Sequence, residues 1–325
     1  MKSDWRGRRV LVTGGAGFLG SGLSLALAQQ GASVVALDAF LRDSGANGLN
    51  LSGSGVEVVV ADLRTADLSP ICRRVDVLFN LAAQVSHMDA EAEPASDLEI
   101  NGAAQLRLIE SLRKHAPDAI VVHASTRQFY GRPQRLPVNE SHPINPQDMN
   151  GVSKFAGEQY WMVEGRTRNR RVTSLRLTNC YGPRLRIKDD RQCFIGVWVR
   201  RLLENQPFEV WDGTQIRDLL YLDDAVAAFL LAAHTPACMG NVFNVGGAEP
   251  VTMLNLAELL VAANGGAGRF VTKPFPEDRA KIDIGSYRTD DAAFRAATGW
   301  VPRMPLPEGL KETLSWFRSR LADYL

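Results

Sequence analysis

The residues most clearly arranged for chemistry form a glycine-rich turn near the start of the chain. Gly14, Gly17 and Gly20 stand in the run GGAGFLG, directly after a short apolar run at 9–13. Glycines at this spacing allow a tight turn, close approach of the backbone to a pyrophosphate and tight packing of the helix that follows. The start of that helix offers free amides and a positive dipole end to phosphates. The turn therefore predicts a dinucleotide-binding site.

A carboxylate at Asp38 supports this prediction. It ends the strand expected at 33–37 and lies about 20 residues beyond the last glycine, where a carboxylate accepts hydrogen bonds from the adenosine ribose hydroxyls. An acid at this place also repels a 2′-phosphate, so NAD is favoured over NADP. The turn and the acid together predict NAD as the cofactor.

The elements that must position these residues alternate between short apolar runs and helical segments, which predicts a Rossmann-type, doubly wound parallel α/β sheet. Strands are expected at 9–13, 33–37, 56–61, 76–81, 119–123, 172–177, 208–211, 219–221 and 241–245. Helices are expected at 23–28, 94–115, 150–168, 194–203, 223–234, 253–263 and 308–321. We assign residues 1–178 to an NAD-binding domain, to which 218–247 returns, and 179–217 with 248–325 to a smaller α/β substrate-binding domain.

Bulk composition excludes several classes of function. A net charge of +1 without a long basic run argues against nucleic acid or an anionic membrane as the main partner. No apolar stretch approaches the roughly 18 residues of a transmembrane helix, and the start of the chain lacks the apolar core of a signal peptide. The four cysteines have neither disulfide-framework nor metal-ligand spacing. We expect a cytoplasmic protein that holds no metal.

Short motifs spread over nearly the whole chain resemble, in their order and spacing, the extended short-chain dehydrogenase/reductases, specifically the NAD-dependent nucleotide-sugar epimerase, dehydratase and decarboxylase group. They are TGGAGFLG at 13–20, LDAF at 37–40, ADL at 61–63, NLAAQ at 80–84, STRQFYG at 125–131, GVSK at 151–154, RLTNCYGPR at 176–184, IRDLLYLDD at 216–224 and FNVGG at 243–247. The resemblance implies transient oxidation of a sugar hydroxyl, usually at C4, by tightly bound NAD.

Roles for individual residues follow from the resemblance where the motifs match. Thr126 matches the residue that hydrogen-bonds the sugar hydroxyl, and Lys154 matches the lysine that binds the nicotinamide ribose. Arg217 resembles the arginine that grips the nucleotide diphosphate, unless it forms a surface pair with Asp218 or Asp224. The expected cofactor-binding residues are Gly14, Gly17, Phe18, Leu19, Gly20, Asp38, Asp62, Leu63, Leu81, Ala82, Ala83, Gln84, Asn101 and Lys154. The expected substrate-binding residues are Arg127, Gln128, Asn179, Arg191, Trp211, Arg217 and Arg279.

The chain departs from the family pattern at three positions. Asn150 occupies the place of the catalytic tyrosine, four residues before the lysine and on the same helix face. A carboxamide does not titrate near neutral pH, so it cannot take the hydroxyl proton as a phenol does. Arg127 and Gln128 replace the acidic pair of the dehydratases, which disfavours standard 4,6-dehydration. Arg127 could instead pair with the carboxylate of an acidic sugar, or face solvent or a neighbouring acid.

Several groups could take over the proton transfer. His87 follows the NLAAQ loop, close to the expected sugar, and imidazole titrates in the right range. Tyr130, a desolvated Lys154, or a water held by Asn150 and Thr126 are alternatives. The sequence does not choose among them.

Three functions remain open on these residues. Epimerisation is the most general, since it needs only oxidation, ketone rotation or enolisation, and hydride return. The alternatives are a one-way oxidoreductase or decarboxylase on the same ligand class, and a catalytically silent protein that binds NAD and a nucleotide sugar. The resemblance also implies a homodimer, formed through the helices that start near Pro94 and Asn150.

Overall fold

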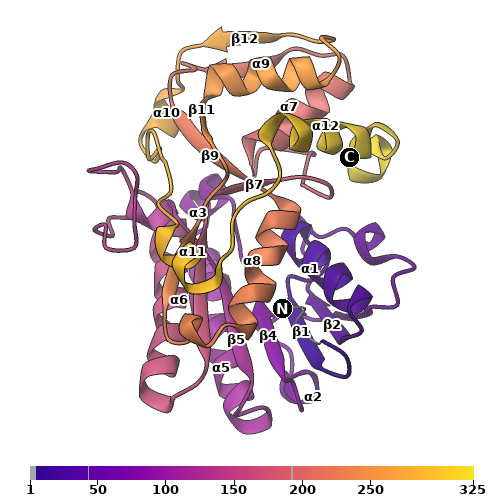
Figure 1. The fold of residues 1–325 in the computed structure, drawn as a ribbon, viewed down its shortest axis with the longest axis vertical. Coiled ribbons are helices and arrows are strands. Elements are labelled where there is room, and N and C mark those ends of the chain that lie inside the picture. Colours follow the sequence, from indigo (N-terminus) through magenta and orange to yellow (C-terminus); the bar gives the residue numbers. More distant parts are fainter. Residues whose placement is uncertain (1–4, 43, 192) are drawn as a thin grey trace.

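The structure is a computed structural model that describes residues 5–42, 44–191 and 193–325. Its larger part is a seven-stranded parallel sheet with the order β10-β6-β5-β4-β1-β2-β3 (Figure 1). The strands are β1 (Arg9–Thr13), β2 (Ser33–Asp38), β3 (Glu57–Val60), β4 (Val77–Asn80), β5 (Ile120–Thr126), β6 (Val172–Leu177) and β10 (Val242–Val245). The predicted doubly wound α/β fold is confirmed.

Helices cover both faces of this sheet, as parallel strands with apolar residues on both sides require. They are α1 (Phe18–Gln29), α2 (Ser69–Cys72), α3 (His87–Ala92), α4 (Pro94–Leu98), the π-helical turn η2 (Glu99–Ala103), α5 (Ala104–His115), α6 (Met149–Arg168) and α8 (Leu222–His234). Val10 and Val12 of β1 pack into one core with Leu23 of α1 and Phe229 of α8. Leu11, between them, points into the opposite core with α5 and α6.

A smaller part caps the carboxyl ends of the strands and lies at the upper end of Figure 1. It holds a three-stranded sheet, β11-β9-β7, and a two-stranded sheet, β12-β8. These strands are β7 (Asn179–Tyr181), β8 (Phe208–Trp211), β9 (Ile216–Tyr221), β11 (Pro250–Thr252) and β12 (Phe270–Lys273). Its helices are α7 (Phe194–Leu203), α9 (Met253–Ala263), α10 (Glu277–Ala280) and α12 (Leu306–Arg318), whereas α11 (Ala292–Thr298) packs against β10 of the larger sheet. Short 3₁₀ turns lie at η1 (Gly48–Leu51), η3 (Gln128–Tyr130), η4 (Pro236–Cys238) and η5 (Leu321–Tyr324).

Local differences from the predicted elements occur near the site. The single helix expected at 94–115 is interrupted by the π-helical turn η2, a feature that often marks functional regions. His87, expected in a loop, begins α3, where the Ser86 hydroxyl caps the helix by accepting from the Asp89 amide. Strands β7, β11 and β12 have three or four residues, too few to show a readable alternation. Within the described ranges, we find no helix with the length and apolarity that a bilayer crossing needs.

Candidate functional site

The glycine turn packs closely at the start of α1. Gly14 has a φ of +66°, and a Cβ there would lie 3.0 Å from the Ala82 backbone, so a larger residue would press against the segment after β4. Gly17 is the N-cap of α1 and has no side chain to satisfy the first amides of the helix. The amides of Phe18 and Leu19 are therefore free for an anion. This donor set fits a dinucleotide pyrophosphate.

The acid at the end of β2 lies beside this turn. The Asp38 carboxylate accepts from the amides of Ala16 and Phe40, each at 3.1 Å. Burial raises the pKa of Asp38, although these backbone hydrogen bonds lower it in part. Further along the sheet edge, Asp62 accepts from Arg64, and Leu63 is buried behind it. Asp38, Asp62 and Leu63 thus lie at or just past the ends of β2 and β3, the edge of the sheet where the adenosine of a dinucleotide is expected.

A buried amide cluster fixes the segment after β4, where Leu81 to Gln84 were expected to contact the cofactor. Asn101 accepts from the Gln84 amide at 3.0 Å and donates to the Gln84 carbonyl at 3.1 Å. Asn150 also donates to that carbonyl, at 3.1 Å, and to Asp97 Oδ1 at 2.9 Å. Asn150 is 1% exposed. Its amide therefore holds this segment and Asp97 in place.

Lys154 lies one turn after Asn150 on α6, on the same face. Its half-buried ammonium has lost enough water that its pKa falls to about 8, although Asp97 opposes the shift. At neutral pH the group stays mostly charged. A cation beside the amide cluster is suited to binding ribose hydroxyls.

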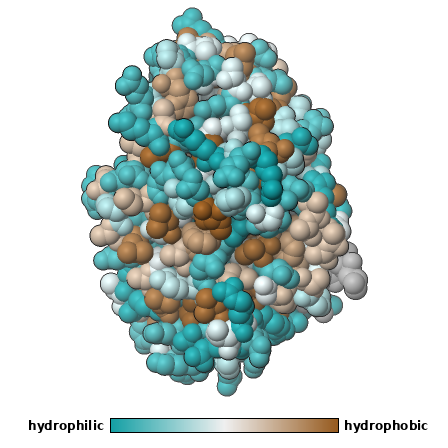
Figure 2. Space-filling view, turned by 90° about the vertical axis from the view of Figure 1, so that its left-hand side faces the viewer, coloured by the Kyte–Doolittle hydropathy of each residue, from teal (hydrophilic) through white to brown (hydrophobic). Residues whose placement is uncertain are grey.

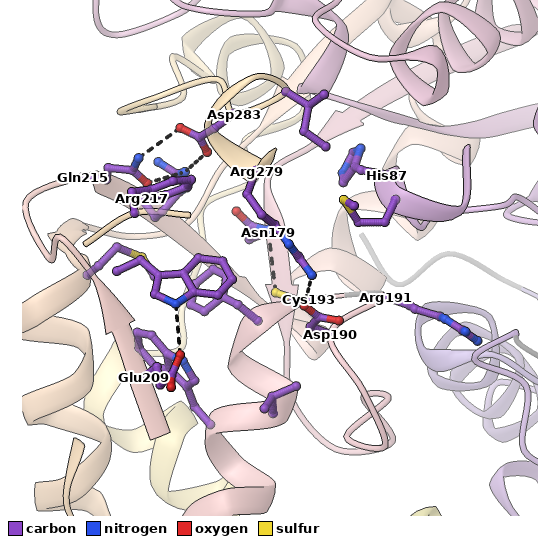
Figure 3. A pocket seen from close by; sticks show the side chains of 18 of the residues that line it. His87, Asn179, Asp190, Arg191, Cys193, Glu209, Gln215, Arg217, Arg279 and Asp283 are labelled. Carbon is purple, nitrogen blue, oxygen red and sulfur yellow. Dashed lines mark hydrogen bonds and ion pairs between the residues drawn. The ribbon is translucent and has the colours of Figure 1, made fainter. Parts of the chain in front are cut away.

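The main cavity has a volume of about 700 Å³ and lies between the strand ends and the smaller part. Figure 3 shows Arg217, Gln215 and Asp283 on one side and His87 on the other, with Asn179 and Arg279 between them. It is lined by all seven residues expected to bind substrate, which are Arg127, Gln128, Asn179, Arg191, Trp211, Arg217 and Arg279. Residues from distant parts of the sequence thus meet at one site.

Arg217 is buried in the cavity wall rather than on the surface. Its Nη2 lies 3.3 Å from Asp283 Oδ1, and the same nitrogen donates to Gln215 Oε1 at 3.0 Å. The alternative pairing with Asp218 or Asp224 is wrong, because the loop that carries Asp283 folds back over β9. Burial, together with repulsion from Arg127, lowers the pKa of Arg217 to about 10, so it remains charged at neutral pH.

Arg127 neither faces solvent nor pairs with a neighbouring acid within the described residues. The side chain is only 8% exposed, so it does not face solvent, and its contacts are with an amide and a ring rather than an acid. Nη2 donates to Asn179 Oδ1 at 2.5 Å, and the guanidinium carbon lies 4.8 Å from the centre of the Tyr287 ring. Nη1 is buried and has no hydrogen-bond partner among the residues that the structure describes.

His87 and Asp148 form an imidazole–carboxylate pair on the cavity wall. His87 Nδ1 lies 2.7 Å from Asp148 Oδ2, within ion-pair distance when the imidazole is protonated. The Gln128 side chain donates from Nε2 to the same oxygen at 3.0 Å, and the Gln128 backbone amide donates to Thr126 Oγ1 at 3.1 Å. Burial raises the pKa of Asp148, but the adjacent His87 imidazole and the hydrogen bonds from Gly151 and Gln128 outweigh it, and the net shift is downward. The carboxylate is therefore held ionised behind the imidazole.

Tyr130 lies in a separate buried network. Its hydroxyl donates to Asn244 Oδ1 at 2.8 Å and accepts from Arg176 at 2.7 Å, while Arg176 pairs with Glu158 at 2.6 Å. Burial raises the pKa of Tyr130. Because the hydroxyl is engaged by two partners and the residue is fully buried, Tyr130 is poorly placed for proton transfer.

Two acids of the site were missed in the sequence. Asp148 is the N-cap of α6, accepting from the Gly151 amide at 2.6 Å, and a helix-start signal at this aspartate was available. Asp97 stands one turn before Asn101, and its Oδ1 accepts from both Asn101 and Asn150. Asp97 is buried in α4, just before the π-helical turn, and its partners come from tertiary packing that no local motif specifies. Within the described ranges no cluster of metal ligands is found.

Comparison with known proteins agrees with this geometry. The profile of the "NAD dependent epimerase/dehydratase family" matches residues 10–246, so the chain belongs to this family. NAD is its cofactor, and the chain is an NAD-dependent enzyme. It is 32% identical to the UDP-glucose 4-epimerase of Mycolicibacterium smegmatis over 317 residues, 96% of this chain and 99% of the relative.

Solved structures of relatives share the whole architecture. The UDP-glucose 4-epimerase of Thermotoga maritima, solved with UDP-glucose, is 29% identical and superposes with a TM-score of 0.87, covering 96% of this chain and 99% of the relative. The UDP-glucose 4-epimerase of Thermus thermophilus, solved with NAD, is 29% identical with a TM-score of 0.84 and the same coverage.

Proposed function

We propose that the protein epimerises a nucleotide-diphosphate sugar at one carbon, which we assign to C4, and that His87 replaces the missing tyrosine as the acid/base. The observation that carries this proposal is the His87–Asp148 pair on the cavity wall, linked through Gln128 to Thr126. The similarity to UDP-glucose 4-epimerases supports a UDP-sugar as ligand.

The proposed chemistry assigns a separate task to each group. NAD, when bound, supplies the hydride acceptor and donor. Thr126 hydrogen-bonds the reacting hydroxyl, and His87 Nε2 takes its proton. The ionised Asp148 carboxylate stabilises the resulting imidazolium and fixes the ring orientation. After the ketone intermediate has rotated in the cavity and been reduced again, His87 returns the proton to the same oxygen. The enzyme therefore ends in its starting protonation state.

The other ligand contacts are proposals of the same kind. Phe18 and Leu19 amides with Asp38 would hold the dinucleotide, and Lys154 would hold the nicotinamide ribose. Arg217 would bind the nucleotide diphosphate. The diphosphate would then compete with the Asp283 carboxylate for the Arg217 guanidinium. A pKa of about 8 also makes Lys154 the alternative base, and the variants described below separate it from His87.

We also propose a homodimer through α4, α5 and α6. Exposed apolar side chains lie along these helices, at Leu98, Leu106, Met149, Val152, Tyr160 and Val163. Figure 2 views the side of the molecule that carries α6, and apolar patches gather across the middle of this face. Analytical ultracentrifugation of the parent and of Val152→Glu tests this. A monomeric parent would refute the proposal.

One assay tests the reaction. Purified protein is incubated with NAD and a panel of UDP-, GDP-, CDP- and dTDP-sugars, and NADH absorbance and the sugar product by NMR are followed. A new sugar without net NADH supports epimerisation. Stoichiometric NADH would instead identify a one-way oxidoreductase, and loss of carbon dioxide a decarboxylase. Binding without turnover of any sugar would sink the proposed reaction in favour of a silent binding protein.

A further inference from the structure

Within the described residues, the charges that line the cavity are paired except at Arg127 and at Arg201, and Arg201 is exposed and donates to the neutral Gln206. The four carboxylates of the lining are each paired with a cation, in the pairs Asp89–Arg191, Asp190–Arg279, Glu209–Lys273 and Asp283–Arg217. Arg127 has no ion pair within the described ranges, although it is more than nine-tenths buried. Its neutral partners, Asn179 and Tyr287, cannot offset the charge. A buried cation without a counter-charge is costly, so this arrangement calls for an anionic ligand.

The unpaired nitrogen has a defined place in the site. Arg127 directly follows Thr126, and its amide donates to the Leu177 carbonyl at 3.2 Å, which anchors it where β5 and β6 end. Nη2 is used by Asn179, whereas Nη1 is unpaired, and Arg127 belongs to the cavity lining. Arg217, with Asp283 and Gln215, lines the same cavity (Figure 3), and burial together with the nearby charge of Arg127 lowers the pKa of Arg217. The cavity thus offers two buried arginines to the anionic groups of one ligand, and of the two only Arg217 has a carboxylate partner within the described residues.

We infer that Arg127 binds a carboxylate on the sugar, and that the substrate is a nucleotide sugar of the hexuronic acid class. This inference rests on the proposed function, because it assigns the sugar end of the same ligand. The guanidinium donates a charge-assisted hydrogen bond to the carboxylate, next to the hydroxyl held by Thr126. The neutral Gln128 beside it adds no repulsion.

Isothermal titration of the NAD-loaded protein with UDP, UDP-glucose and UDP-glucuronic acid tests the inference. The parent should bind UDP-glucuronic acid at least about tenfold more tightly than UDP-glucose, the range for one hydrogen bond to a charged group. Arg127→Gln should reduce that preference to within about threefold while leaving the affinity for UDP unchanged. Arg127→Lys keeps the charge and should retain part of the preference. Thermal melting confirms that each variant is folded.

A matched variant and the adverse outcomes make the test decisive. Arg279→Gln removes a cavity arginine that is already paired with Asp190, so it should keep the preference for the acid whatever it does to overall affinity. Equal affinity of the parent for the two sugars overturns the inference and leaves the proposed function intact. Parallel loss of UDP and UDP-sugar affinity in Arg127→Gln would make Arg127 a diphosphate ligand and also overturns it. Failure of all three ligands to bind removes the proposed function itself.

Discussion

Replacing Asp148 with asparagine should separate the orientation of His87 from the shape of the site. The carboxylate uses Oδ1 to cap α6 through the Gly151 amide at 2.6 Å, and Oδ2 to receive His87 and Gln128. An asparagine can keep the cap with its single oxygen. Its NH₂ group then faces two donors, so His87 loses both its acceptor and the charge that stabilises the imidazolium.

The size of the effect follows from the one contact that is lost. A hydrogen bond between a charged pair contributes about 1.5–3 kcal/mol, which corresponds to about 10- to 150-fold in kcat. Asp148 is not among the residues that line the cavity, and it lies outside the glycine turn at 14–20. The affinity of the Asp148→Asn variant for UDP should therefore stay within about threefold of the parent. Retention of the cap predicts a small change in thermal stability.

Product NMR under saturating sugar measures kcat, and calorimetry with UDP measures binding. Asp89→Asn is the matched control, since Asp89 is a cavity carboxylate paired with Arg191 rather than with His87. An Asp148→Asn variant with the kcat of the parent, or one no slower than Asp89→Asn, refutes the reasoning.

Three further predictions concern other groups of the site. Asn150→Tyr should lose the hydrogen bond to Asp97 and alter the rate or product of turnover; a variant that matches the parent in both, by NMR, shows that position 150 is outside the chemistry. Burial lowers the pKa of His123 to about 4, with Glu158 opposing and Lys154 adding to the shift, so the unfolded state takes up the proton first as pH falls from 6.5 to 4. This should destabilise the parent by about 3 kcal/mol over that interval, and urea titrations of His123→Gln should show a flatter pH dependence; equal slopes contradict the assignment. Asp38→Ala should narrow a preference for NAD over NADP, measured by fluorescence titration, and an unchanged ratio would contradict the ribose contact.

The sheet was predictable because its strands are buried on both faces and its glycine turn leads from strand to helix in the required order. Val10, Leu11 and Val12 form a continuous apolar run that serves two cores at once. The three-residue strands were not predictable, since their place depends on β9, to which β7 and β11 pair across distant sequence.

Candidate site residues were predictable where a local motif specified them, and their partners were not. Arg217 was named from its motif, but Asp283, its counter-ion, is 66 residues away. The place of Asn150 one helical turn before Lys154 was visible in the sequence, whereas its hydrogen bond to Asp97 depends on two helices packing together. The position of Asp148 behind His87 likewise arises from tertiary contact between α3 and α6.

The most direct test of the account is the turnover of His87→Gln compared with Lys154→Gln, measured by NMR on the sugar that the parent converts. General acid–base catalysis is worth about 10²- to 10⁴-fold, so His87→Gln should lose kcat by that factor while its affinity for UDP stays nearly constant. If His87→Gln instead turns over within about threefold of the parent, His87 is not the group that takes the proton.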